Sequence, residues 1–185
     1  MRIRKAIQLT VVVVIIVVAI LVLSWYRPAS APSPTADITF TIALDRNGSV
    51  GTAYDIGYIP ATLLIDKEGV VRGREVGPFG SQEALISWLD DLTSSEAEPP
   101  PSGVDPLIGN AAPGFILPTL DGRTVELSQL RGKWVLLTFW TTWCSGCQIL
   151  MPYLQAAFEE KGGQIEFIGI NLRESEEKVR RHIEG

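Results

Sequence analysis

The two cysteines of this chain, Cys144 and Cys147, lie three positions apart in the segment TFWTTWCSGCQILMP. Residues 133–140 before them are an apolar run of strand length, and residues 145–160 have the apolar spacing of a helix. A thiolate at the start of a helix faces unpaired backbone N–H groups and the positive end of the helix dipole, so its pKa falls to ~3.5–7.5 from about 8.5. We therefore expect Cys144 to be the exposed nucleophile and Cys147 the thiol that resolves a mixed disulfide.

Two other uses of a thiol pair compete with redox chemistry. A structural zinc site needs four ligands, whereas the chain has no further cysteine and one histidine, His182, on a separate predicted helix. A structural disulfide here would close a very short loop and remove little entropy from the unfolded chain. Redox exchange is therefore favoured, and a metal-binding thiol module remains an alternative. No metal is expected, and no cofactor beyond the Cys144–Cys147 disulfide.

The predicted strands and helices alternate along the chain, which is typical of an α/β fold. Residues 38–44 alternate apolar and polar side chains as a strand does, and residues 45–50 have turn chemistry. Two strands joined at Gly69 come next, followed by an amphipathic helix over 81–92 with Ser81 as its N-cap. The rest of the chain predicts a hairpin at 115–127, the strand and helix around the cysteines, a strand at 164–170, and a helix at 175–184 with Val179 and Ile183 inward.

An apolar, uncharged segment at residues 6–26 has the length that a helix needs to cross a bilayer. Arg2, Arg4 and Lys5 precede it, so the positive-inside rule predicts a cytoplasmic N-terminus and an extracytoplasmic domain. The alternative is a signal peptide cleaved after ASA at 29–31, but the apolar run is long for a signal and a proline would follow the cut. We expect a single-pass anchor in the cell membrane, with the lipid bilayer as partner of this segment.

Charge and composition limit the partners and divide the chain. The sequence has 16 basic and 21 acidic residues, a net charge of −5, and its basic residues form no long run, so nucleic acid is not expected as a partner. Residues 27–36 are a Pro/Ser/Ala tether. Residues 94–106 contain consecutive prolines and lack periodicity, which indicates a linker.

The residues around the cysteines resemble a known family. The segment DGRTVELSQLRGKWVLLTFWTTWCSGC is similar to the start of a thioredoxin-fold domain of the TlpA/ResA type, the membrane-anchored thiol–disulfide oxidoreductases of bacteria. Phe139-Trp140 and Trp143-Cys144 match that family's FWxxWCxxC pattern, and the resemblance covers residues 107–185. It implies catalytic roles for Cys144 and Cys147 and a substrate contact for Trp143. It also implies supporting roles for Ser145, Gly146 and Pro152, the last matching the family's helix-kinking proline.

An earlier segment, residues 38–77, resembles the second half of the same family. The family's pattern there is a strand, AYxI, a proline loop and LIDxxG, and this chain has AYDIGYIPATLLIDKEG. In the family the proline matching Pro60 is cis and lies against the dithiol. The resemblance therefore implies that Ile59 and Pro60 bind substrate, with the main chain of Ile59 pairing with a substrate strand. Taken alone, Pro60 would be an ordinary turn proline.

The two halves stand in the reverse of the family's order. A circular permutation predicts one thioredoxin-like domain, a central mixed sheet flanked by helices, plus one N-terminal transmembrane helix. The alternative is the remnant of a broken tandem, or two chains that exchange halves. The expected organisation is an anchor at 1–26, the tether at 27–36, the C-terminal half with the cis-proline loop at 37–93, the linker at 94–106, and the N-terminal half with the CxxC motif at 107–185.

We expect a thiol–disulfide oxidoreductase acting on protein disulfides. The resemblance suggests reduction, with apocytochrome c as one substrate and a membrane thiol protein as electron donor. Two departures from related proteins stand out: Leu150 replaces the glutamate of ResA-type proteins, and Thr138 replaces the buried acid of thioredoxins. Turnover without either carboxylate is expected to be slow. A peroxide-reducing variant of the fold is less favoured, and a non-catalytic remnant is the alternative.

Overall fold

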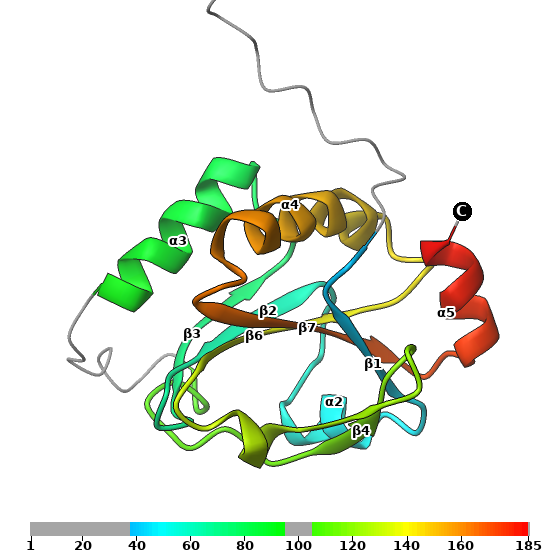
Figure 1. Ribbon diagram of the computed structural model, residues 1–185, viewed down its shortest axis with the longest axis horizontal. Helices are drawn as coiled ribbons and strands as arrows, with labels where there is room; N and C mark the ends of the chain where they lie inside the picture. Colours follow the sequence, from blue (N-terminus) through cyan, green and yellow to red (C-terminus); the bar gives the residue numbers. More distant parts are fainter. Residues whose placement is uncertain (1–37, 95–104, 185) are drawn as a thin grey trace, which may run out of the picture. The chain divides into compact units, whose positions relative to one another are not determined.

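The computed structural model of the protein describes residues 38–94 and 105–184 (Figure 1). The predicted anchor at 6–26, the tether at 27–36 and most of the linker at 94–106 lie outside the described residues. Within the described ranges, no helix is long and apolar enough to cross a membrane.

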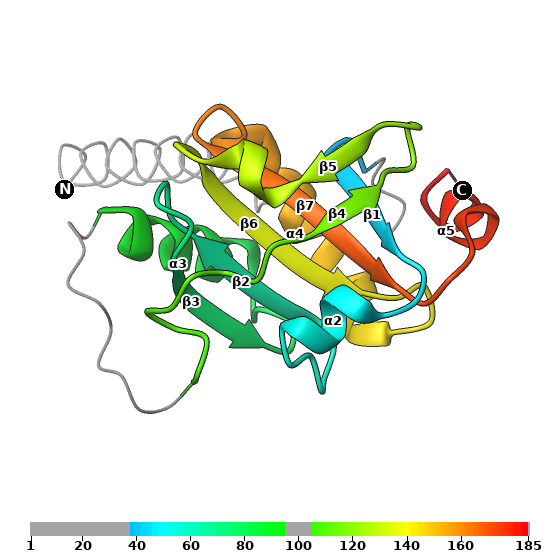
Figure 2. The same ribbon diagram turned by 90° about the horizontal axis from the view of Figure 1, so that it is seen from below.

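Both halves of the chain contribute strands to one mixed five-stranded sheet (Figure 2). Its order is β1 (Thr41–Asp45), β7 (Ile165–Leu172), β6 (Trp134–Trp140), β2 (Ala61–Ile65) and β3 (Val71–Val76). The pairs β1–β7 and β7–β6 are parallel, whereas β6–β2 and β2–β3 are antiparallel. The first half of the chain thus supplies the two edge strands and β2, and the second half supplies the two strands enclosed between β1 and β2.

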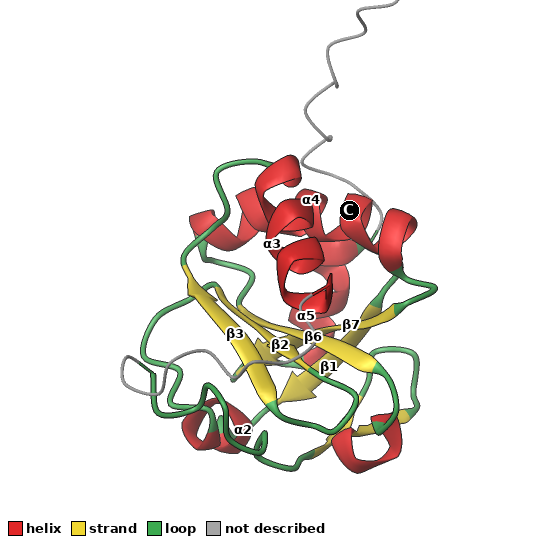
Figure 3. Cartoon of the chain, turned by 90° about the vertical axis from the view of Figure 1, so that its left-hand side faces the viewer, coloured by secondary structure: helices red, strands yellow, loops and turns green. Residues whose placement is uncertain are grey.

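Helices cover one face of this sheet, and a short helix with a hairpin covers the other (Figures 1 and 3). The first layer holds α3 (Gln82–Ser94), α4 (Ser145–Lys161) and α5 (Glu176–Ile183). The second layer holds α2 (Ser49–Ala53), β4 (Ile116–Pro118), β5 (Thr124–Glu126) and the 3₁₀ helix η1 (Leu127–Leu130). This is a thioredoxin-like α/β architecture.

The apolar core lies on both faces of the sheet because the central strands are buried on both sides. All five residues of β2 are buried, and so are the last six of β6. Leu64 and Leu136 face the α3–α4 layer, whereas Leu63 and Leu137 face the α2 layer. Near-continuous apolar strands are what a sheet covered on both faces requires.

Most predicted elements are present, whereas α2 and the 3₁₀ helix η1 were not predicted. The β2–β3 hairpin is confirmed, and Ser81 Oγ accepts a hydrogen bond from Ala84 N at 3.2 Å, as an N-cap does. Within the predicted turn segment 45–50 only residues 46–48 are a turn, and α2 begins directly after them at Ser49. Five residues are too few for a helix to form without tertiary support. That support comes from Asp45, whose buried Oδ2 accepts a hydrogen bond from Gly51 N at 2.8 Å.

The register between the halves predicts how core mutations behave. Leu63 on β2 lies opposite Leu137 on β6, and both are fully buried. Leu63→Ala and Leu137→Ala should each lower the free energy of unfolding by about 2–5 kcal/mol, because each leaves a cavity. The double variant should be non-additive, since the two side chains are neighbours. Urea unfolding of the full chain in mild detergent, followed by circular dichroism, measures this.

Val76→Ala is the matched control, because Val76 is a half-exposed residue of the edge strand β3 and should cost under about 1 kcal/mol. An unchanged midpoint for Leu63→Ala would mean that the first half of the chain does not belong to the core.

Candidate active site

The two cysteines form a disulfide at the beginning of α4, with 5.2 Å between their Cα atoms. Cys144 is the N-cap of the helix, and its Sγ accepts a hydrogen bond from Cys147 N at 3.2 Å. Cys144 is 8% exposed and Cys147 is 1% exposed. The expected order of accessibility is found, but Cys144 is itself mostly buried rather than exposed. Of the two cysteines, Cys144 therefore has more surface open to a reaction partner.

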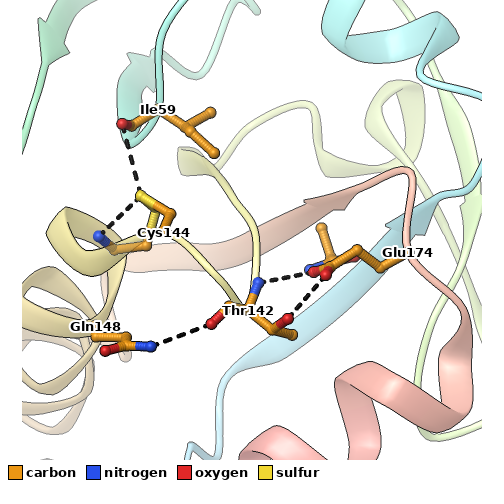
Figure 4. The surroundings of a disulfide bond; sticks show 7 residues. Ile59, Thr142, Cys144, Gln148 and Glu174 are labelled. Carbon is orange, nitrogen blue, oxygen red and sulfur yellow. Dashed lines mark hydrogen bonds between the residues drawn. A yellow bond between two sulfur atoms is a disulfide. The ribbon is translucent and has the colours of Figure 1, made fainter.

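The proline loop lies directly against this disulfide. The Ile59–Pro60 peptide bond is cis, and the carbonyl oxygen of Ile59 is 3.6 Å from Cys144 Sγ (Figure 4). A Cβ atom added at Gly146 would stand 3.2 Å from Pro60 Cδ, so the helix and the loop are in close contact. The sequence prediction that Pro60 comes to rest beside the sulfur atoms therefore agrees with the geometry, although Pro60 and Cys144 are 84 positions apart in the sequence.

Two exposed aromatic side chains adjoin in sequence the residues that meet at the disulfide, since Trp143 precedes Cys144 and Tyr58 precedes Ile59. Trp143, which was expected to contact substrate, is 68% exposed, and Tyr58, which was not predicted, is 80% exposed. Ser145 is exposed at the first turn of α4, and Pro152 is buried within the helix. Because proline has no N–H, the hydrogen bond from position 152 to the Gln148 carbonyl does not form.

A buried carboxylate holds the loop in front of Cys144, and sequence reasoning missed it. Glu174 accepts hydrogen bonds from Thr142 N at 2.7 Å, Thr142 Oγ1 at 2.8 Å and Asn171 Nδ2 at 2.8 Å, and it pairs with Lys178 Nζ at 2.6 Å. On the other side of the loop, Gln148 Nε2 donates to the Thr142 carbonyl at 3.1 Å (Figure 4). The peptide two residues before Cys144 is thus held from both sides.

The hydrogen bonds to Glu174 keep it ionised despite its burial. Burial alone would raise the pKa of this carboxyl, but hydrogen bonds from Lys178, Asn171 and Thr142 outweigh that effect and lower its pKa from 4.5 to about 2. The sequence did contain a signal for this residue. Thr142 follows β6 and Glu174 follows β7, and the carboxyl ends of neighbouring parallel strands meet at one edge of a sheet.

Residues 150 and 138, where related proteins carry an acidic side chain, are uncharged parts of the core in this structure. Leu150 is fully buried, and Thr138 Oγ1 lies 3.3 Å from Thr62 Oγ1 in a buried hydroxyl pair. His182, on α5, is exposed and its ring centroid lies 6.0 Å from that of Trp140. Among residues 38–94 and 105–184, no group of three or more His, Cys, Asp or Glu side chains is arranged to hold a metal ion.

Comparison with known proteins found a matching family model and a group of similar curated proteins. Residues 108–185 match the model of the AhpC/TSA family. The chain is similar to the thiol-disulfide oxidoreductase ResA of Bacillus cereus, with 40% identity over 79 residues. It is also similar to ResA of Oceanobacillus iheyensis, with 42% identity over 84 residues, and of Bacillus subtilis, with 40% identity over 68 residues.

These matches cover only part of each protein. They span 41%, 42% and 36% of this chain, and 44%, 43% and 38% of the respective relatives. The chain therefore matches less than half the length of these curated relatives.

The Glu174 hydrogen bonds predict a specific pH dependence. Because the pKa of Glu174 is lowered from 4.5 to about 2, its stabilisation is fully present above pH 4.5 and is lost as the pH falls towards 2. Glu174→Gln should lower the free energy of unfolding by about 2 kcal/mol at pH 7, and the difference from wild type should shrink below pH 4.5. Urea titrations between pH 3 and pH 7 measure it.

Glu177→Gln, which changes an 82% exposed carboxylate on the adjoining helix α5, is the control and should change stability by under about 0.5 kcal/mol. A Glu174→Gln deficit that stays constant down to pH 3 would contradict the assignment of the ionised carboxylate as the stabilising group.

Proposed function

We propose that the protein is a membrane-anchored, extracytoplasmic thiol–disulfide oxidoreductase that reduces disulfides in proteins. One observation carries the proposal: the sulfur of Cys144 lies at the N-terminus of α4 and 3.6 Å from the Ile59 carbonyl of the cis-proline loop. Backbone N–H groups favour the thiolate form of Cys144, and the exposed Tyr58 and Trp143 give a substrate polypeptide apolar surface beside the sulfur. The similarity to ResA proteins supports the same activity.

The reaction balances with two thiols and one disulfide. The Cys144 thiolate attacks one sulfur of the substrate disulfide, which forms a mixed disulfide and releases the other substrate sulfur as a thiolate. The Cys147 thiolate then attacks Cys144 Sγ, releases the second substrate thiolate and leaves the Cys144–Cys147 disulfide. Solvent protonates the two substrate thiolates. A second thiol protein in the membrane returns two electrons to the disulfide and closes the cycle.

The N-terminal sequence and the family resemblance suggest where this happens. Residues 6–26 would anchor the chain in the cell membrane with the positively charged end in the cytoplasm. Apocytochrome c, whose cysteines must be reduced before haem attachment, is the substrate that the resemblance favours. With Leu150 and Thr138 in place of carboxylates, the proton of Cys147 passes to water or to backbone groups, and we expect turnover to be slow for this reason.

Replacing the nucleophile tests the activity. In an insulin-reduction assay driven by dithiothreitol, the full chain in detergent should accelerate precipitation, and Cys144→Ser should reduce the rate to that of dithiothreitol alone. Cys147→Ser keeps the nucleophile and should accumulate a mixed disulfide with insulin, visible on a non-reducing gel. Equal rates for wild type and Cys144→Ser would remove the oxidoreductase assignment.

We propose further that residues 37–93 and 107–185 of one chain complete one domain, as in a circular permutation. The pairing of β2 with β6 and of β1 with β7 supports this arrangement. A domain made by a single chain unfolds at a midpoint that does not depend on protein concentration. We expect an unchanged urea midpoint over a hundredfold range of concentration and one chain per particle by light scattering. A midpoint that rises with concentration, together with a dimer, would indicate exchange of halves between chains.

A further inference from the structure

A cavity of about 410 Å³ opens beside the disulfide, and the reaction as proposed does not use it. At one end it is lined by Ile59, Thr141 and Trp143, which adjoin Cys144 in space or in sequence. Its lining also includes Arg173, in the turn after β7, and Lys178, in the first turn of α5. Pockets of this size bind small ligands or single side chains with their adjoining main chain.

The cavity has more positive than negative charge, in a protein whose net charge is −5. Its charged lining residues are Glu174, Lys178 and Arg173. Glu174 and Lys178 form an ion pair with each other, and the carboxylate also accepts three other hydrogen bonds. Within residues 38–94 and 105–184, the Arg173 side chain has neither a carboxylate within 4.0 Å nor a hydrogen-bond partner. The guanidinium is thus the charge available to a ligand.

The position of Arg173 is fixed by the backbone on both sides. Its φ is 58°, in the left-handed region that few non-glycine residues adopt, and its N–H donates to the Asp45 carbonyl at 3.0 Å. Its side chain fills the space that a Cβ at Gly48 would occupy, since such an atom would stand 2.1 Å from Arg173 Nε. An unusual backbone conformation at the edge of a reactive site is a feature of functional residues.

A second polar group lines the same cavity without a partner. Thr141 is 3% exposed, and its hydroxyl makes no hydrogen bond within the described part of the chain. A buried hydroxyl without a partner costs free energy unless a ligand or water satisfies it. A carboxylate accepts hydrogen bonds from both a hydroxyl and a guanidinium, and guanidinium groups bind it through two parallel bonds.

We propose that this cavity, between Trp143 and Arg173, binds an acidic side chain that lies close in sequence to the reactive cysteine of the substrate. The inference rests on the proposed function and names its preferred substrate class: disulfide-bonded polypeptides with Asp or Glu near the cysteine. The exposed rings of Tyr58 and Trp143 flank the substrate chain, Arg173 binds the carboxylate, and Thr141 donates to it.

Matched peptides test the subsite by turnover. Disulfide-linked dimers of a short single-cysteine peptide carry Glu, Gln or Lys at one position, either before or after the cysteine. We expect the full chain in detergent to reduce one of the two Glu peptides with a kcat/KM about tenfold higher than that of its Gln counterpart, mainly because KM is lower. The corresponding Lys peptide should have the lowest kcat/KM of the three. Arg173→Gln should remove this preference, whereas Arg181→Gln, which changes a 74% exposed arginine on α5, should keep it. Equal rates for Glu and Gln peptides at both positions overturn the subsite.

A neutral small disulfide and a binding measurement separate the subsite from the activity. Reduction of 2-hydroxyethyl disulfide should be the same for wild type and Arg173→Gln, because this substrate has no charge for the arginine to bind. Loss of that reaction in the wild type overturns the proposed function. Independently, the same peptides with serine in place of cysteine, carrying a fluorophore, report binding by anisotropy without chemistry. A Glu peptide bound no tighter than the Gln peptide, or an affinity that does not fall with added salt, overturns the subsite whatever the turnover shows.

Discussion

The antiparallel pairing of β2 with β6 is the interaction on which the site depends. It sets Ala61 opposite Phe139, so the loop that ends at Pro60 reaches the same edge of the sheet as the residues that follow β6. A slip of β2 by one residue would turn Leu63 to the wrong face of the sheet, away from Leu137, and move the loop away from Cys144. The core therefore enforces the register, and the register positions Ile59 against the sulfur. The order of the two strands along the sequence does not affect this contact, because strands pair with their neighbours in space.

Around the sulfur atoms the polarity is divided between two sides. Towards the core, Thr138 pairs with a neighbouring hydroxyl and Leu150 is apolar, so no carboxylate at these positions opposes ionisation of a thiol. Towards the solvent edge, the Glu174 carboxylate is negatively charged. Its oxygens accept hydrogen bonds from the backbone N–H and the hydroxyl of Thr142, so the charge is engaged with the loop. What stabilises a Cys144 thiolate is then chiefly the backbone at the beginning of α4, including the N–H of Cys147. The chemistry is placed on a rigid helix end, and the loop beside it is held by side chains.

The elements that could be predicted from the sequence are those whose conformation depends on residues close to one another in the chain. The apolar run before Cys144 and the helical spacing after it are local, and β6 and α4 appear where they were expected. The contact of Pro60 with Cys144 is not local, and it was reached only through the resemblance to a family. Helix α2 was missed because its five residues owe their conformation to Asp45 and to packing on Leu172, neither of which a propensity can report. Glu174 and Arg173 were missed because a charged turn residue looks the same in sequence whether it faces solvent or a buried loop.

The arrangement of the sheet has a consequence for how a nascent chain acquires it. Strands β1 and β2 leave the ribosome early, yet β7 and β6 separate them in the finished sheet. Thr41 has no partner on that side until Ile168 has been synthesised, and β2 presents an unpaired edge until β6 arrives. The last strands must enter the middle of the sheet rather than extend one of its edges, which makes the contacts strongly non-local and the folding slow. Until β6 and β7 have been synthesised, the emerging polypeptide displays open strand edges, and a holding chaperone would protect them from aggregation.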